Sequence, residues 1–289
     1  MDRRSFLNVL LTASVAAPVA AVTAHMEKTM PLASPEKTKD VADRIIDTRQ
    51  ITFNYISNGP MLAINPSTGK PSGIFYDLTQ RFGELAKLEI KWGFESTFAT
   101  YPEDIRLGKC DAVACGIWPT AQRAKVVNFS LPAYYSGVGV YVRQDDHRFD
   151  GDVQKLDDPK FRIATLDGEM SQFIQESDFP KASILTLSNS NDLTMLAESV
   201  ATGKADATFL EKALASTYMA NNQKVLRCLT DAKPIRIFEN TWAFPYGSER
   251  LKSIIDVAMK EMVSSGYVDK LLTKYGQEES FYRVRTPIQ

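Results

Sequence analysis

Histidine and cysteine, which most often supply metal ligands and nucleophiles, are scarce in this sequence. The histidines are His25 and His147, and the cysteines are Cys110, Cys115 and Cys228. A histidine-rich zinc site and a Ser-His-Asp triad therefore lack parts. Cys110 and Cys115 flank one expected strand, about 17 Å apart, which is too far for a disulfide. We expect buried thiols, no metal and no cofactor.

Charged side chains are plentiful and nearly balanced in sign. The 289 residues include 34 Lys and Arg against 35 Asp and Glu, a formal net charge of −1. This balance lacks the excess of basic residues that is typical of nucleic-acid-binding proteins. Hydrophobic residues make up 44 % and charged residues 24 %, as in soluble globular proteins. The length predicts two domains.

The N-terminus has the pattern of an export leader. Arg3-Arg4 precedes an uncharged run, rich in Ala and Val, over residues 8–22. The paired arginines resemble the twin-arginine signal, whose route exports folded proteins. Val22-Thr23-Ala24 fits a signal-peptidase site, so we expect cleavage near Ala24 and a mature protein in the periplasm, with an uncleaved anchor as the alternative. No cysteine precedes Cys110, which argues against a lipoprotein anchor.

Strands and helices are expected to alternate from about residue 50, after a polar, proline-containing tether. A helix is expected from Asp77, with a buried stripe that includes Leu78 and Phe82. The expected strands of this half cover residues 51–56, 88–94 and 111–115, with a short helix over 101–107. This alternation predicts an α/β domain with a mostly parallel sheet.

A second α/β set follows the charge-rich residues 143–151. A helix is expected to begin at Glu169, and another has the buried stripe Leu193, Leu196 and Val200. The expected strands cover residues 161–166, 184–187, 205–210 and 241–245, followed by helices over 251–264 and 268–275. The pattern therefore predicts a second lobe of the same class.

Six sequence blocks occur in an order typical of one protein family. They are Gly73-Ile74-Phe75-Tyr76-Asp77-Leu78, Gly108-Lys109-Cys110-Asp111-Ala112-Val113, Thr120-Ala121-Gln122-Arg123, Asn128-Phe129-Ser130-Leu131-Pro132-Ala133-Tyr134-Tyr135, Gly203-Lys204-Ala205-Asp206-Ala207, and Gly266-Tyr267-Val268-Asp269-Lys270 through Lys274-Tyr275-Gly276. Over roughly residues 51–276 the chain thereby resembles the type II periplasmic binding proteins of the polar amino-acid uptake class, the bacterial extracellular solute-binding proteins of family 3.

The resemblance implies a two-lobed type II fold, in which two connecting strands form a hinge that closes the lobes on a ligand. The implied segments are a signal over 1–24, a linker over 25–48, lobe 1 over 49–142 plus 239–280, lobe 2 over 143–238 and a tail over 281–289. Each lobe is a mostly parallel sheet flanked by helices. The implied function is capture of a small polar, amino-acid-like ligand for an ABC permease in the inner membrane, without catalysis, by a monomer that binds no nucleic acid.

The resemblance also implies which charged residues hold the ligand. Arg123 corresponds to the family's arginine for the ligand carboxylate, which a guanidinium fork matches bidentately. Thr120 would cap the same helix and offer its amide. Glu211 ends an expected strand where the family usually has an aspartate for the ligand ammonium. A surface arginine, a plain cap and a solvated helix-start glutamate are the alternatives.

Aromatic and small residues complete the implied binding site. Tyr55, Phe98 and Trp118 lie where the family lines its cleft, and Gly116 shortly precedes the Thr-x-x-Arg block. Rings supply apolar area and contact a cation with their faces. Packing in the core is the alternative for each ring.

The turn Gly168-Glu169-Met170-Ser171 departs from the family pattern, in which two hydroxyl residues follow the glycine. Glu169 would repel a ligand carboxylate unless a cation intervenes, or else it stabilises the helix N-terminus and faces solvent. With Met170 and Ser171 it belongs to the expected site. If Glu169 faces the cleft, a cationic or non-amino-acid ligand is favoured.

Two other functions stay open. Periplasmic cyclohexadienyl dehydratases share the fold, and here Glu169 or Glu211 would need a raised pKa to act as the acid. An accessory binding protein of a periplasmic dehydrogenase is the other alternative. The sequence does not identify the ligand or the permease.

Overall fold

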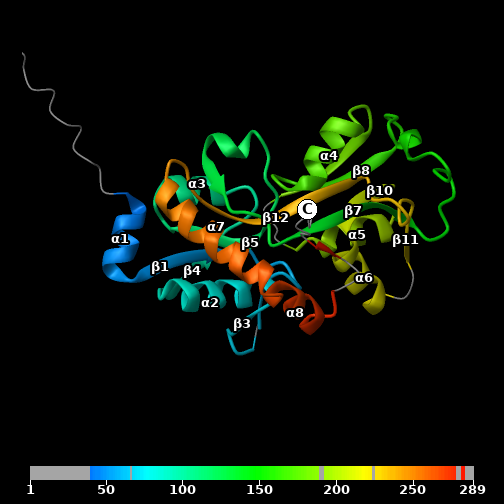
Figure 1. Cartoon of the computed structure of the whole chain (residues 1–289). Coiled ribbons are helices and arrows are strands. Elements are labelled where there is room, and N and C mark those ends of the chain that lie inside the picture. The colour runs from blue at the N-terminus through cyan, green and yellow to red at the C-terminus, as the bar shows by residue number, and fades with distance from the viewer. Residues whose placement is uncertain (1–39, 66, 189–191, 223–224, 278–280, 284–289) are drawn as a thin grey trace, which may run out of the picture. The chain divides into compact units, whose positions relative to one another are not determined.

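The described residues, 40–65, 67–188, 192–222, 225–277 and 281–283 of the computed structural model, form an α/β arrangement (Figure 1). They belong to the compact unit that begins at Lys39, whereas the expected leader and its cleavage site lie outside the described residues. In this described part, no helix is long and apolar enough to cross a membrane.

The first group of strands is parallel, as the alternation predicts. Strand β1 (Gln50–Tyr55) lies between β4 (Glu89–Glu95) and β5 (Ala112–Ile117) and pairs with both in parallel. Helices α2 (Ile74–Ala86) and α3 (Tyr101–Arg106) make the connections. The strands and the short helix predicted here are confirmed.

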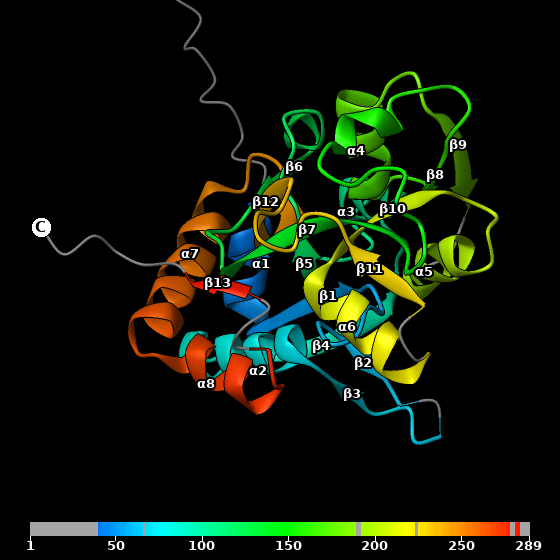
Figure 2. The ribbon, with the colours of Figure 1, turned by 90° about the vertical axis from the view of Figure 1, so that its right-hand side faces the viewer.

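The second group repeats this pattern around β8 (Arg162–Leu166), which pairs in parallel with β9 (Ser183–Leu187) and β10 (Ala207–Glu211). Its helices are α4 (Met170–Asp178), α5 (Thr194–Ala201) and α6 (Lys212–Asn221). Helices α5 and α6 pack beside β10, as Figure 2 shows. The strands predicted in this half are confirmed, and β10 ends at a residue of the expected site.

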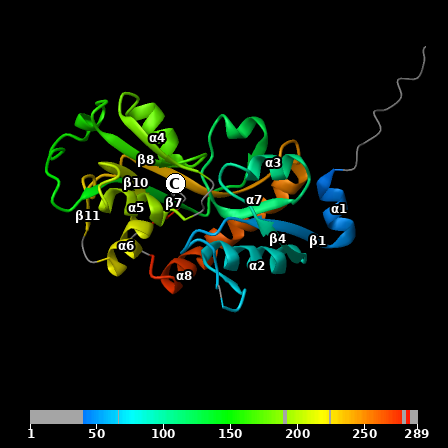
Figure 3. The same cartoon turned by 180° about the vertical axis from the view of Figure 1, so that it is seen from behind.

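Two long strands join the groups into one sheet, ordered β4-β1-β5-β12-β7-β10-β8-β9. Strand β7 (Tyr134–Arg143) pairs antiparallel with β10 and also with residues 236–240 of β12 (Arg236–Pro245). Residues 241–245 of β12 continue along β5 and β6 (Val127–Phe129). Figures 1 and 3 show β7 and β12 crossing between the groups. The type II fold with its two connecting strands is confirmed.

The remaining elements surround this sheet. They are α1 (Val41–Thr48), β2 (Ala63–Ile64), β3 (Pro71–Ser72), the 3₁₀ turns η1 (Arg123–Lys125) and η2 (Val153–Leu156), β11 (Leu226–Cys228), α7 (Glu249–Ser264), α8 (Tyr267–Lys274) and β13 (Phe281–Arg283). The last part of the expected tether is thus helical. Asp40 caps α1 by accepting from the Ala42 amide at 3.2 Å, and Ala42 and Ile45 are buried.

Helix α2 begins at Ile74, before the expected start at Asp77, because of Gly73. Its φ is 124°, and a Cβ there would lie 2.6 Å from the Met61 carbonyl oxygen, so the position requires glycine. Asp77 instead accepts hydrogen bonds from Lys274 Nζ at 2.6 Å and Tyr275 Oη at 3.0 Å. It ties α2 to α8.

Aromatic rings fix the strands that end at the site. Phe53 of β1 packs edge-on against Phe82 of α2 at 6.1 Å and Trp242 of β12 at 5.6 Å, and all three are fully buried. Because β5 lies between β1 and β12, this core also fixes its position, and Gly116 and Trp118 lie at its end.

The cysteines are free, and two of them are the predicted buried thiols. Cys110 and Cys115 are buried, and burial raises the pKa of each to about 12. Cys228 is partly buried. Thiolate chemistry is therefore disfavoured at Cys110 and Cys115.

Candidate functional site

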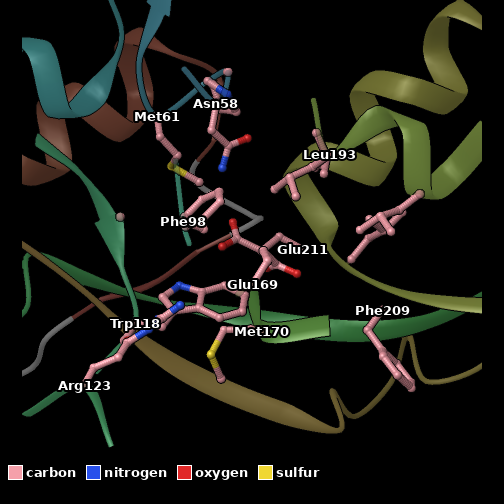
Figure 4. A pocket seen from close by; sticks show the side chains of 16 residues that line it. Asn58, Met61, Phe98, Trp118, Arg123, Glu169, Met170, Leu193, Phe209 and Glu211 are labelled. Carbon is pink, nitrogen blue, oxygen red and sulfur yellow. The ribbon is translucent and has the colours of Figure 1, made fainter. Parts of the chain in front are cut away.

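A narrow pocket lies where β5, β10 and the start of α4 approach one another (Figure 4). Its cavity volume is about 20 Å³, room for about one water molecule. The lining residues are Asn58, Gly59, Pro60, Met61, Phe98, Gly116, Trp118, Arg123, Glu169, Met170, Leu193, Leu196, Phe209, Leu210, Glu211 and Leu214. Most are apolar, and two are acidic. Both strand groups contribute to the lining.

Glu211 enters the pocket from the end of β10, directly before α6. Its backbone pairs with Val138 of β7, which fixes where the side chain leaves the sheet. The pKa of Glu211 is raised from 4.5 to about 8, mainly by burial and secondly by the nearby Glu169. A hydrogen bond with Ser136 lowers this pKa but does not offset the rise. At neutral pH this carboxyl group therefore retains its proton in most molecules.

Glu169 enters from the N-terminus of α4 and is only 7 % exposed. Its Oε2 accepts a hydrogen bond from the Ser171 amide at 2.7 Å. Gly168 before it has a φ of 70°, and a Cβ there would lie 2.9 Å from the Ala99 Cα. Burial raises the pKa of Glu169, whereas bonds from Ser171 and Met170 lower it and the charge of Arg123 lowers it least.

The two carboxyl groups lie side by side in the middle of the pocket (Figure 4). No lysine or arginine of the described ranges forms an ion pair with Glu169 or Glu211. Glu169 contributes to the raised pKa of Glu211, and two neighbouring acids without a cationic partner attract a cation.

A chain of polar groups connects the pocket to the two crossing strands. The indole Nε1 of Trp118 donates to Asn240 Oδ1 at 3.3 Å, and Asn240 Nδ2 donates to Ser136 Oγ at 2.6 Å. Ser136, on β7, bonds to Glu211. The Trp118 ring also stacks on Phe238 of β12, with centroids 4.4 Å apart. Trp118 and Glu211 are thus positioned by β7 and β12.

Arg123 lies at the edge of the pocket beside Trp118, apart from the two acids (Figure 4). Its Nη1 donates to the Trp118 carbonyl at 2.9 Å, and its Nη2 donates to the Gly168 carbonyl. The guanidinium also lies over the rings of Tyr101 at 5.5 Å and Phe173 at 5.3 Å. Backbone oxygens and rings therefore bind the arginine that the resemblance gives to a ligand carboxylate.

Three other expected site residues lie outside the pocket lining. Thr120 Oγ1 accepts from the Arg123 amide at 3.1 Å, and the N-cap of η1 is Gln122. Ser171 Oγ accepts from the Leu166 amide at 3.0 Å. Tyr55 packs edge-on against Trp92. The other seven residues of the expected site line the pocket.

The lining also contains residues that sequence reasoning missed. Asn58, Gly59, Pro60 and Met61 come from the turn that follows β1. The apolar side chains Leu193, Leu196, Phe209, Leu210 and Leu214 complete the wall. Leu193 and Leu196 belong to a helical stripe, and periodicity does not distinguish a stripe that faces a core from one that faces a pocket.

A wider groove adjoins the pocket. It has a cavity volume of about 590 Å³ and shares the lining residues Asn58, Gly59, Pro60, Leu193 and Leu214 with the pocket. Its charged lining residues are Glu95 and Asp192. Within the described residues, no three His, Cys, Asp or Glu side chains gather closely enough to hold a metal ion.

The family model for bacterial extracellular solute-binding proteins, family 3, matches residues 54–278. The chain belongs to this family. The match begins near the end of β1 and covers the later strands of both groups, the crossing strands and every residue that lines the pocket. The pocket of this solute-binding protein is therefore its candidate ligand site.

Relatives of this solute-binding protein are distant in sequence. It is 22 % identical over 217 residues to the probable amino-acid-binding protein YxeM of Bacillus subtilis (strain 168), covering 73 % of this chain and 78 % of that protein. It is 24 % identical over 234 residues to the amino-acid-binding protein AabA of Dichelobacter nodosus, covering 79 % and 88 %.

A solved structure shares the fold. The ancestral amino acid-binding protein AncCDT-1, described as a precursor of cyclohexadienyl dehydratase, superposes with a TM-score of 0.70 at 22 % identity, over 82 % of this chain and 99 % of that one. This likeness supports the type II fold of this solute-binding protein.

Proposed function

We propose that this solute-binding protein captures a small amino-containing solute in the periplasm and delivers it to an ABC importer. The observation that carries the proposal is the pair of acids in an apolar pocket lined from both strand groups, where Glu169 is buried and Glu211 is partly buried. An ammonium group is the natural partner for such a pair, because it supplies the missing positive charge. Relatives named as amino-acid-binding proteins fit this ligand class.

Capture would proceed by closure of two lobes about β7 and β12. The proposed boundaries are residues 49–142 plus 239–280 for one lobe and 143–238 for the other. The bond from Arg123 to the Gly168 carbonyl and the close packing of Ala99 on Gly168 connect these lobes. Since the pocket has a cavity volume of only about 20 Å³, the ligand would enter while the lobes are apart.

The proposed ligand contacts combine charge and apolar area. Glu211 and Glu169 would hold the ammonium group, and Phe98, Trp118 and Met170 would contact the rest of the ligand. Residues 1–24 would direct export, with cleavage near Ala24, and N-terminal sequencing of the periplasmic protein tests this.

Thermal-shift screening of the purified full chain tests the binding function. The panel holds amino acids, polyamines and organic acids at millimolar concentration. A ligand that binds only the folded state raises the melting temperature by mass action, and we expect amino-containing compounds to produce the shifts. A panel in which no compound raises the melting temperature contradicts the proposal.

A dehydratase is the second candidate function, because the pKa of Glu211 lies near 8. A carboxyl group that stays protonated at neutral pH can act as a general acid. Incubation with prephenate or arogenate, followed by ultraviolet detection of the aromatic product, tests this. Turnover that disappears in Glu211→Gln would establish catalysis, and its absence leaves binding as the function.

A further inference from the structure

We infer that the ligand is an organic amine without a carboxylate, held by its ammonium group between Glu169 and Glu211. The inference narrows the ligand class of the proposed function and rests on it. The inferred ligand differs from an amino acid in lacking a carboxylate, because the protein's own groups already bond to those that would otherwise bind a ligand carboxylate.

The N-terminus of α4 is the first such group. Free amides at a helix N-terminus attract a carboxylate, but here Glu169 Oε2 accepts from the Ser171 amide at 2.7 Å. Glu169 is 93 % buried beside the pocket. The protein thus supplies its own carboxylate where a ligand carboxylate would bind, and a second one there would be repelled.

Arg123 is the second such group. Both terminal nitrogens of its guanidinium donate to backbone carbonyls, one of Trp118 and one of Gly168. The rings of Tyr101 and Phe173 lie 5.5 and 5.3 Å from it. Two of the five N–H donors of the guanidinium bond to these carbonyls and the rings lie over its face, so Arg123 acts as a positioning residue that holds Gly168, and with it the Glu169 turn.

The lining around the acids suits the body of an amine. Ionisable residues that line the pocket and the adjoining groove are the acids Glu95, Glu169, Asp192 and Glu211 and a single base, Arg123. This excess of negative charge draws cations toward the pocket. The Phe98 and Trp118 rings and the nearby leucines offer apolar contact to a methylene chain or an aromatic ring.

Ligand pairs that differ by one carboxylate test the inference directly. Isothermal titration calorimetry of the full chain would compare cadaverine with lysine, agmatine with arginine, and 2-phenylethylamine with phenylalanine. We expect the amine of at least one pair to bind tenfold or more tightly than its amino acid. Amino acids that bind as tightly as their amines, or more tightly, in every pair overturn the inference and leave the proposed function intact.

Glu169→Gln measures the contribution of the protein's own carboxylate. Glutamine retains an oxygen that can accept from the Ser171 amide but removes the negative charge. We expect the preference for the amine over its amino acid to fall about tenfold. Glu176→Gln, on the same helix and exposed, is the matched control and should leave the preference unchanged. An equal preference in Glu169→Gln and wild type contradicts the role of Glu169.

If no compound of the three pairs binds and no compound of the thermal-shift panel raises the melting temperature, both the inference and the proposed function are overturned. The melting temperatures of the ligand-free variants show whether each is folded. The two failures are therefore distinguishable: in the first, each amino acid binds at least as tightly as its amine, and in the second nothing binds.

Discussion

Two groups of acids in this protein have pKa values that are shifted in opposite directions. In the pocket, Glu169 and Glu211 have raised pKa values because burial is not offset by a cation. Near the end of β7, Asp146 is 6 % exposed against 7 % for Glu169, yet hydrogen bonds from Arg148 hold its pKa below the ordinary value. Burial alone therefore does not decide the charge state of an acid. Hydrogen bonds from an arginine side chain lower the pKa of Asp146, and neither pocket acid receives such a bond from the described residues.

The comparison separates a structural cluster from a binding site. Arg148 Nε and Nη2 donate to Asp146 at 2.8 and 2.5 Å, and Nη2 also donates to Asp206 at 2.6 Å. These bonds satisfy the acids from within the protein. In the pocket, the nearest arginine bonds to carbonyl oxygens instead, and under the proposed function a ligand supplies the positive charge.

The largest expected effect is loss of binding in Glu211→Gln. Removing one of two acids that hold an ammonium group should weaken amine binding about 100-fold, since one buried charge-assisted bond is lost. Titration calorimetry at pH 7.5 measures this. Glu198→Gln, an acid of α5 outside the pocket lining, is the control and should bind normally. Wild-type affinity in Glu211→Gln would remove the pocket acids from the proposed site.

The next effect concerns stability and pH in the ligand-free protein. Since the pKa of Glu211 is about 8 in the folded state against an ordinary value of 4.5, the folded state retains a proton that the unfolded state has released between these values. The free energy of unfolding should therefore fall as pH rises from about 5 to 8, by about 3 to 4 kcal/mol. Urea denaturation at several pH values measures the slope. A slope that persists in Glu211→Gln belongs to another group.

Asp146 should respond in the opposite direction. Its pKa is lowered in the folded state, so its stabilising contribution is present above the ordinary pKa of Asp and is lost as pH falls through the folded-state value. Removing its partner in Arg148→Ala should cost about 2 kcal/mol of unfolding free energy, discounted because Arg148 is half exposed and Arg143 stays nearby.

Denaturation at neutral pH measures the cost of Arg148→Ala. Arg106→Ala is the matched control, because its pair with Glu103 is exposed on both sides, and it should cost less than about 0.5 kcal/mol. Equal costs for the two variants would show that burial of Asp146 does not distinguish its cluster from a surface pair.

The smallest effect is expected from Trp118→Phe. Phenylalanine can retain the stack on Phe238 but loses the indole N–H that donates to Asn240. One buried hydrogen bond contributes about 1 kcal/mol, so ligand affinity should fall only several-fold if the network merely orients the ring. Calorimetry with the best amine measures this. A loss as large as that of Glu211→Gln would mean that Trp118 is a principal ligand contact.

Much of the site could be predicted because the sequence blocks that resemble the family place these residues at strand ends. Glu211 ends β10 and Glu169 begins α4, as the strand and helix patterns predicted. Tyr55 and Ser171 were expected in the pocket, but Tyr55 packs on Trp92 and Ser171 bonds to the Leu166 amide. Position along the sequence does not determine which neighbouring ring or amide a side chain contacts. Strand β7 was not predicted, since its long buried run has no alternation and contains two glycines.

By itself, the sequence determined the α/β class, the order of elements, the family and the presence of an acid in the Gly168 turn. Periodicity and local turn chemistry are properties of neighbouring residues, so the sequence carries them directly. Only the tertiary structure decided that Glu169 faces Glu211 and that Arg123 bonds to the Trp118 and Gly168 carbonyls. Those contacts join residues more than forty positions apart, or depend on which acceptor is nearest, and the pKa of an acid follows from the burial and partners that packing creates.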